Sequence, residues 1–276
     1  MSDNPLSKYY RTPSVYIKLP SHGKYWPDGS LDLPPNGEIP VLPMNGKDDI
    51  ALRNADGLMN GTTTVDIIQS CCPNIKDAWK MPMIDLDSVL IAIRQASYGQ
   101  TMSFTSKCSK CGEFHDYEID LGLVRDTIKL PNYEESLMVN DLMIVAKPAT
   151  YKLNNEVNQE KFDQQRALRA IQDAGLTDEQ RIEKFKEAVS ELTAKAVGRL
   201  ASFIDYIITP DGTKVVDEHF IQEFISNADQ KTFNIVKDFI TKMNGSYGIE
   251  PILTKCDKCG NEEKRTFQFD PSNFFG

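Results

Sequence analysis

The sequence predicts an α+β protein with a Pro-rich β N-terminal region, a mixed body that contains a split four-cysteine ribbon, and an inserted all-helical block. Three observations predict this class. Eight of the 15 prolines lie in the first 43 residues, two Cys-x-x-Cys pairs lie far apart, and apolar residues between them recur every three or four positions. We therefore divide the chain into an arm at 1–45, a body at 46–150 plus 245–276, and a helical insertion at 151–244.

The N-terminal arm cannot form a long helix, because each proline removes a backbone donor and fixes φ. Short strands and turns are expected instead, with Pro27-Asp28-Gly29 as one turn. Five aromatic residues supply the large amphipathic surfaces that protein interfaces favour: Tyr9, Tyr10, Tyr16, Tyr25 and Trp26. We expect the arm to contact partner proteins. The alternative is that its aromatic residues fold back into the chain's own core.

The body shows both helical and strand patterns. Helices are predicted near Asp48–Ala55, Thr64–Cys72 and Leu86–Ala96, and strands at Met102–Thr105, Phe114–Ile119 and Leu137–Ala146. Asp85 or Asp87 is placed to cap the start of the third helix.

The insertion carries the strongest helical periodicity. Thr177 and Gln180 form a capping box, and the apolar spacing beyond them predicts one long helix from Asp178 to Ile208, preceded by a helix that ends at Gly175. Two further helices are expected at about Asp217–Ile225 and Ala228–Met243.

An internal duplication surrounds the cysteine pairs. Ser97-Tyr98-Gly99, Lys107-Cys108-Ser109-Lys110-Cys111-Gly112 and Asp120 match Ser246-Tyr247-Gly248, Lys255-Cys256-Asp257-Lys258-Cys259-Gly260 and Asp270 in kind and nearly in spacing. Each copy reads as a turn, a strand, a Cys-x-x-Cys-Gly knuckle and a second strand. Each copy therefore supplies half of a four-cysteine site.

A Cys-x-x-Cys-Gly turn points two thiolates at one ion, and two such turns complete a tetrahedron. The sequence predicts one structural Zn²⁺ per chain, bound by Cys108, Cys111, Cys256 and Cys259. Because 144 residues separate Cys111 from Cys256, whereas an ordinary zinc ribbon has about 15 to 20 between its pairs, the ribbon must be split.

Several alternatives to this metal site stay open. Four cysteines could bind iron, as in rubredoxin, or could act as redox dithiols. His115 could be a ligand, although a solvent-facing strand residue is the simpler interpretation. The four knuckle lysines (Lys107, Lys110, Lys255 and Lys258) could offset the thiolate charge or could simply be solvated. We expect the adjacent Cys71 and Cys72 to pack in the core.

Composition and missing motifs exclude several function classes. With 31 basic against 40 acidic residues and a net charge of −9, the chain is not expected to bind nucleic acid. No apolar run approaches the ~20 residues of a membrane span, and no export signal is visible, so synthesis in a cytoplasm is expected. Phosphate-binding, dinucleotide-binding and hydrolase motifs are absent, and we predict that the chain is not an enzyme.

Four segments carry a family resemblance: Leu19-Pro20-Ser21-His22-Gly23-Lys24-Tyr25, Leu42-Pro43-Met44, Ile93-Arg94-Gln95-Ala96-Ser97-Tyr98-Gly99, and Phe269-Asp270-Pro271. Together with the cysteine pairs, they resemble the baseplate hub protein family of T-even (T4-type) contractile-tailed phages. The resemblance covers residues 15 to 150 and the C-terminal half of the ribbon. It implies a non-enzymatic structural or assembly protein, made in the host cytoplasm and located in the virion tail baseplate, whose partners are other baseplate and tail hub proteins.

Two further functions remain open from the sequence. One is a zinc-ribbon nucleic-acid-binding or transcription-related protein, because ribbons often serve there, although the net charge opposes it. The other is a baseplate assembly chaperone that is absent from the finished virion.

Overall fold

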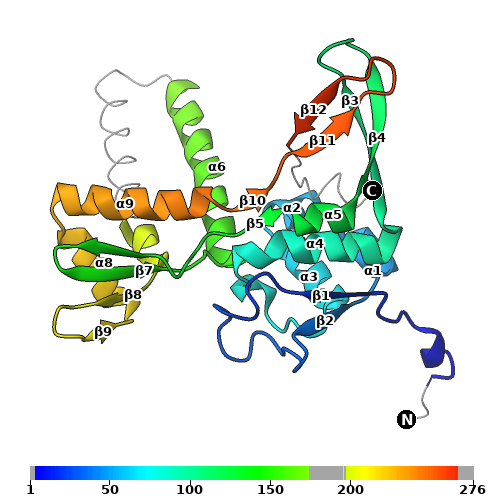
Figure 1. The fold of residues 1–276 in the computed structure, drawn as a ribbon. Coiled ribbons are helices and arrows are strands. Elements are labelled where there is room, and N and C mark those ends of the chain that lie inside the picture. Colours follow the sequence, from blue (N-terminus) through cyan, green and yellow to red (C-terminus); the bar gives the residue numbers. More distant parts are fainter. Residues whose placement is uncertain (1–3, 174–194, 196, 267–276) are drawn as a thin grey trace. The chain divides into compact units, whose positions relative to one another are not determined.

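The computed structural model describes residues 4–173, 195 and 197–266 and divides the chain into two compact units (Figure 1). Unit 1 comprises Met1–Leu130 and Tyr247–Gly276, and unit 2 comprises Pro131–Ser246. Helices and strands occur in both units, which confirms the predicted α+β class. None of the helices in the described part of the chain combines the length and apolar character needed to cross a bilayer.

Unit 1 consists of helices and four two-stranded sheets, two of which carry the cysteine pairs. Its elements are η1 (Ser7–Tyr9), β1 (Val15–Lys18), β2 (Glu38–Val41), α1 (Gly46–Ala51), α2 (Ala55–Met59), α3 (Thr62–Cys71), η2 (Ala78–Lys80), α4 (Met83–Tyr98), β3 (Thr101–Lys107), β4 (Phe114–Asp120), α5 (Leu121–Asp126), β5 (Ile128–Lys129), β10 (Gly248–Ile249), β11 (Ile252–Lys255) and β12 (Glu262–Arg265). The sheets pair β1 with β2, β3 with β4, β11 with β12, and β10 with β5, all antiparallel.

Helix α4 forms the centre of unit 1. It packs against β1, β2, α3 and α5. Residues 88–93 of α4 are all buried, so this helix is covered around its whole circumference rather than along one stripe. The predicted helix at Leu86–Ala96 is therefore confirmed and extended at both ends.

The predicted capping role of Asp85 or Asp87 is wrong, because α4 already begins at Met83. Asp85 is fully buried instead and accepts hydrogen bonds from the backbone N–H of Ser21 (2.7 Å), the Ser21 hydroxyl (2.5 Å) and Trp26 Nε1 (2.8 Å). Asp85 thereby attaches the turn at residues 21–26 to α4, since a buried carboxylate requires such donors.

Part of the predicted arm contributes to the core of unit 1, because Ile17, Leu19, Ile39 and Val41 are at most 3% exposed. The alternative that the aromatic residues of the arm form this core is not what the structure shows, because Tyr9, Tyr10 and Tyr16 are exposed and Tyr25 and Trp26 are only partly buried. Short strands do form there, as predicted. Before β1, Arg11 hydrogen-bonds to the carbonyl oxygen of Pro43 (2.6 Å) and to Asp48 (3.1 Å), while Leu6, Tyr9 and Tyr10 stay exposed.

The chain leaves and re-enters unit 1 at neighbouring strands. Ile128 pairs with Ile249 and Lys129 with Gly248, and Lys129 forms an ion pair with Glu250 (2.6 Å). Unit 2 is therefore an insertion whose two connections start from one short ladder.

Unit 2 contains an antiparallel sheet in the order β6-β7-β8-β9, together with helices. Its elements are β6 (Ser136–Val139), β7 (Leu142–Ala146), α6 (Tyr151–Asp173), β8 (Ile204–Ile208), β9 (Lys214–Val215), α8 (Glu218–Asn227) and α9 (Gln230–Gly245), and residues 197–202 are also helical. Helix α9 contacts β6 and α8 contacts β8. Asp217 and Asp229 cap these two helices, which confirms the helices predicted near Asp217–Ile225 and Ala228–Met243.

The predicted all-helical character of 151–244 is wrong. Residues 204–208 form β8 in the middle of the sheet, where β-branched and aromatic side chains pack on a pleated surface. The predicted long helix from Asp178 to Ile208 therefore cannot reach Ile208; residues 174–194, its capping box and the predicted end at Gly175 lie outside the described residues. The single strand predicted at Leu137–Ala146 is in fact the hairpin of β6 and β7.

Candidate metal centre

Two hairpins carry the cysteine pairs at their turns, β3–β4 with residues 108–112 and β11–β12 with residues 256–260. Both turns use the same backbone hydrogen bonds. The Cys108 N–H donates to the oxygen of Glu113 (2.9 Å) and the Cys256 N–H to that of Asn261 (2.8 Å). The N–H groups of Gly112 and Gly260 donate back to the first cysteine of each turn (3.0 and 2.8 Å). The duplication seen in the sequence is therefore also a duplication of backbone geometry.

The glycine of each knuckle is required by its backbone conformation. Gly112 has φ 72° and Gly260 has φ 66°, a left-handed conformation that is costly for residues with a Cβ. This conformation turns the chain back into the second strand and leaves both sulfurs of the pair on the same side.

The four predicted cysteines come together although the two pairs lie in the two separate sequence segments of unit 1. Their sulfurs all lie within 4.8 Å of one another, with Cys108 Sγ 3.7 Å from Cys259 Sγ and Cys111 Sγ 3.8 Å from Cys256 Sγ. A tetrahedral site with metal–sulfur bonds of about 2.3 Å has sulfurs about 3.8 Å apart. The cluster therefore has the dimensions of a tetrathiolate site and can hold a metal ion.

Backbone N–H groups favour the thiolate form at one position. The N–H groups of Cys111 and Lys110 lower the pKa of the Cys108 thiol to about 6. A thiolate, and not a thiol, is the form that binds a metal. The knuckle backbone therefore prepares Cys108 for coordination.

His115 lies beside the cluster. Its Nε2 atom is 3.2 Å from Cys256 Sγ and 3.6 Å from Cys111 Sγ, and its ring meets the edge of Tyr117. The imidazole is therefore half-buried against the sulfurs rather than turned to solvent. Because four thiolates already complete a tetrahedron, Nε2 is placed to donate a hydrogen bond to a sulfur when it carries the proton.

Two of the four knuckle lysines pair with carboxylates. Lys255 lies 3.9 Å from Glu262 and Lys258 lies 3.6 Å from Glu113, and all four side chains are well exposed. Exposed pairs of this kind contribute little to stability. We find no role for these two lysines in neutralising the thiolates.

Arg265 is a functional residue that the sequence analysis missed. Its guanidinium donates to the Ser106 hydroxyl and to the carbonyl oxygen of Lys107 (3.0 Å), and lies 4.9 Å from the centre of the Tyr117 ring. Arg265 thus joins β12 to the end of β3, next to Cys108 of the cysteine cluster. The exposure of β12 alternates and places Arg265 on its less exposed side, but all four residues of this strand are charged, so the sequence gives no signal for this role.

The remaining two cysteines belong to the core, as predicted. Cys71 and Cys72 are fully buried, and burial raises the pKa of the Cys71 thiol to about 12 and that of Cys72 further. Protonated, buried thiols of this kind act as small apolar side chains.

Comparison with known proteins identifies the family. Searches of curated proteins and of solved structures find no significant match to this chain. The family model described as T4 bacteriophage base plate protein matches residues 17–276, which include both knuckles and both units. The chain therefore belongs to the T4 bacteriophage base plate protein family.

Proposed function

We propose that this protein is a structural or assembly component of the baseplate hub of a contractile-tailed phage. It acts through contacts with other baseplate and tail hub proteins, is assembled in the host cytoplasm and becomes part of the virion. The family match over residues 17–276 carries this proposal. A structural family of this kind suggests a role without catalysis.

We further propose that Cys108, Cys111, Cys256 and Cys259 bind one structural Zn²⁺. The spacing of their sulfurs supports a tetrahedral ion, and zinc is the usual metal in four-cysteine sites that are closed. With all four positions filled by protein, such a site offers no place for a reactive water. Its contribution is to join the β3–β4 and β11–β12 hairpins, which the contacts of Arg265 and the Ser109–Glu263 hydrogen bond also connect.

The family match is equally compatible with an assembly chaperone that is absent from the virion. The two possibilities differ in whether the chain persists in finished particles. Mass spectrometry of purified virions, with this chain quantified against other tail proteins, distinguishes them: a fixed ratio supports a virion component, and absence from particles supports a chaperone.

Metal analysis tests the zinc site. Protein purified without added metal should contain about one equivalent of zinc, and Cys256→Ser should lose it and melt at a lower temperature. Cys72→Ala is the matched control, because it also removes a buried cysteine but should retain the zinc. Two equivalents, or full zinc content in Cys256→Ser, would show that the two knuckles do not share one ion.

A further inference from the structure

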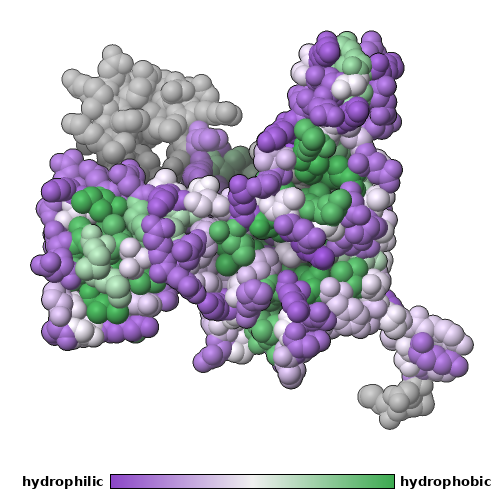
Figure 2. Space-filling model, viewed as in Figure 1, coloured by the Kyte–Doolittle hydropathy of each residue, from purple (hydrophilic) through white to green (hydrophobic). Residues whose placement is uncertain are grey.

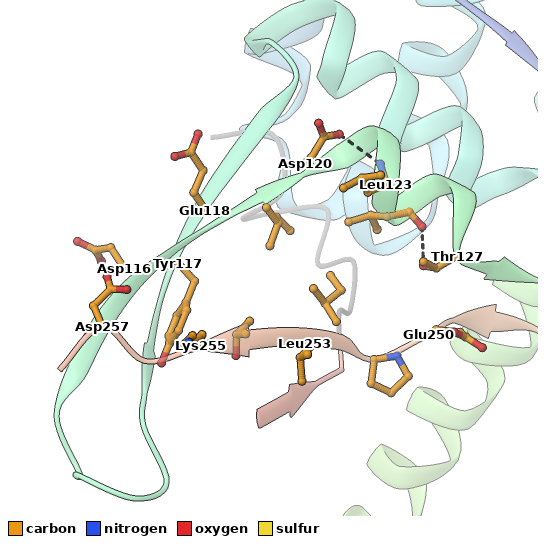
Figure 3. A pocket seen from close by; sticks show the side chains of 15 residues that line it. Asp116, Tyr117, Glu118, Asp120, Leu123, Thr127, Glu250, Leu253, Lys255 and Asp257 are labelled. Atoms are coloured by element: carbon orange, nitrogen blue, oxygen red, sulfur yellow. Dashed lines mark hydrogen bonds between the residues drawn. The ribbon is translucent and has the colours of Figure 1, made fainter. Parts of the chain in front are cut away.

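An open cleft of about 640 Å³ lies between β4 and β11 (Figure 3), and its lining reaches Asp257 in the second cysteine knuckle. This volume is within the range of about 300 to 1,000 Å³ that is usual for ligand clefts. All of its lining belongs to unit 1. In Figure 3, Tyr117 projects from β4 toward Lys255 of β11, and α5 with Leu123 bounds the other end.

The cleft is bounded by two strand edges. Its lining includes every residue from 116 to 120 on β4 and every residue from 250 to 255 around β11. If a strand lined the cleft with one face of its sheet, only alternate residues would line it, because successive side chains point to opposite faces. Consecutive lining residues therefore indicate that the edge of the strand borders the cleft. Among the described residues, β4 pairs only with β3 and β11 only with β12, so each strand turns an unpaired edge toward the cleft.

Apolar side chains line part of the cleft. Tyr117 and Ile119 are buried in its wall, whereas Leu123 and Leu253 are 68% and 62% exposed. Figure 2 shows this hydrophobic surface over β11 and α5, below the largely hydrophilic tip of the hairpins. An extended segment with alternate apolar residues would cover these side chains while its backbone paired with an edge.

The cleft has an excess of negative charge. Five carboxylates line it against one cation, Lys255: Asp116, Glu118, Asp120, Glu250 and Asp257. Three have partners, because Asp116 accepts from Thr105, Asp120 caps α5 and Glu250 pairs with Lys129. Glu118 and Asp257 have no hydrogen-bond or ion-pair partner within the described part of the chain.

We propose that this cleft binds an extended segment of another baseplate protein that carries lysine or arginine beside apolar residues. The segment adds a strand to the edge of β4 or β11 and places its cations near Glu118 and Asp257. This inference rests on the proposed function, since it assigns a surface to the contacts proposed there. Charge complementarity selects the partner.

The same charge disfavours two other occupants. A second copy of the chain would bring two acidic edges together, which like-charge repulsion opposes. Residues 267–276 contain Asp270 and no lysine or arginine, so this segment does not complement the carboxylates.

Charge reversal in the intact phage tests the cleft. The double variant Glu118→Lys with Asp257→Lys should lower the amount of this chain in tails by about tenfold, equivalent to about 1.4 kcal/mol. The matched control is Glu223→Lys with Asp238→Lys, which makes the same change in net charge on exposed positions of unit 2. Zinc content and melting temperature of both purified variants should equal those of the wild type.

Site-specific cross-linking then identifies the occupant. A benzophenone amino acid in place of Leu253 should form an adduct with a basic, extended segment of another tail protein, and the same amino acid in place of Phe220, which is similarly exposed, should not reach that segment. An adduct to residues 267–276 or to a second copy would overturn the inference.

The outcomes separate this inference from the function on which it rests. Normal incorporation of the cleft variant would overturn the inference alone, because the wild-type chain would still be present in tails. Absence of the wild-type chain from both tails and assembly intermediates would overturn the proposed function and the inference together.

Discussion

Two aspartates that lie two residues apart in the first turns of α4 each connect this helix to a segment distant in sequence. Asp85 holds the turn at residues 21–26, and Asp87 accepts a hydrogen bond from the Tyr247 hydroxyl (2.7 Å). Burial raises the pKa of both carboxyl groups above the usual range. Each hydrogen bond acts in the opposite direction, because it stabilises the ionised form.

The Tyr247–Asp87 contact gives a pH-dependent prediction. Asp87 has a folded-state pKa above its unfolded value, so its stabilising contribution is complete below about pH 4 and is lost as the pH rises. Tyr247→Phe removes the donor and raises this pKa further. We expect the variant to be destabilised by about 1–3 kcal/mol near neutral pH and by less at pH 4.

Denaturant unfolding at a series of pH values measures this difference. The duplication supplies the control, because Tyr98 occupies the equivalent Ser-Tyr-Gly position but is 47% exposed. Tyr98→Phe should show little pH dependence. A loss of stability in Tyr247→Phe that is constant with pH would show that Asp87 is not the group involved.

At the scale of elements, the sequence predicted those helices and hairpins whose formation depends on the local spacing of apolar and turn residues. Helices α3, α4, α8 and α9 and the two cysteine hairpins follow apolar spacing and turn residues, and their predictions are confirmed. The four cysteines were also found by spacing, because a Cys-x-x-Cys-Gly turn has few other uses. The contacts of His115 and Arg265 could not be predicted, since they depend on how two sequence-distant hairpins meet.

The strands of unit 2 show why periodicity can mislead. Ile204, Ile207 and Ile208 fit a helical spacing, yet these β-branched residues lie in a strand that pairs with β7, which is distant in sequence. Between β6 and β7, Asn140 and Asp141 form a two-residue turn with φ 49° and 62°. Paired positive φ values are typical of the type I′ hairpin turn, so Asn-Asp was the missed signal.

This turn supports a prediction of its own. Asp141→Val should destabilise unit 2 by about 1–2 kcal/mol, because a β-branched residue is strained at positive φ. Asp141→Gly should be neutral or stabilising at the same position. Hydrogen exchange at the amides of β6 and β7 should accelerate in the valine variant only, and equal exchange in both variants would contradict the turn assignment.

At the scale of the whole molecule, the four-cysteine cluster closes a loop that contains an entire unit. Cys111 and Cys256 are separated by 144 residues, most of which belong to unit 2. Unit 1 nevertheless has its own core around α4 and its own closing ladder, β5 with β10. The ribbon is thus split in sequence only, and its two halves belong to the same compact unit.

Unit 1 should therefore fold and bind zinc without unit 2. Facing Cα atoms in the β5–β10 ladder lie about 5 Å apart, so a glycine-serine linker of about four residues can replace residues 131–246. Shortening the loop between the knuckles changes the entropy of closure only logarithmically, by about 1 kcal/mol. The shortened chain should unfold cooperatively and bind one equivalent of zinc, and adding Cys256→Ser should abolish that binding. A shortened chain that stays unfolded with zinc present would show that unit 2 is needed to bring the two cysteine pairs together, and the metal would then depend on the insertion rather than on the core that surrounds α4.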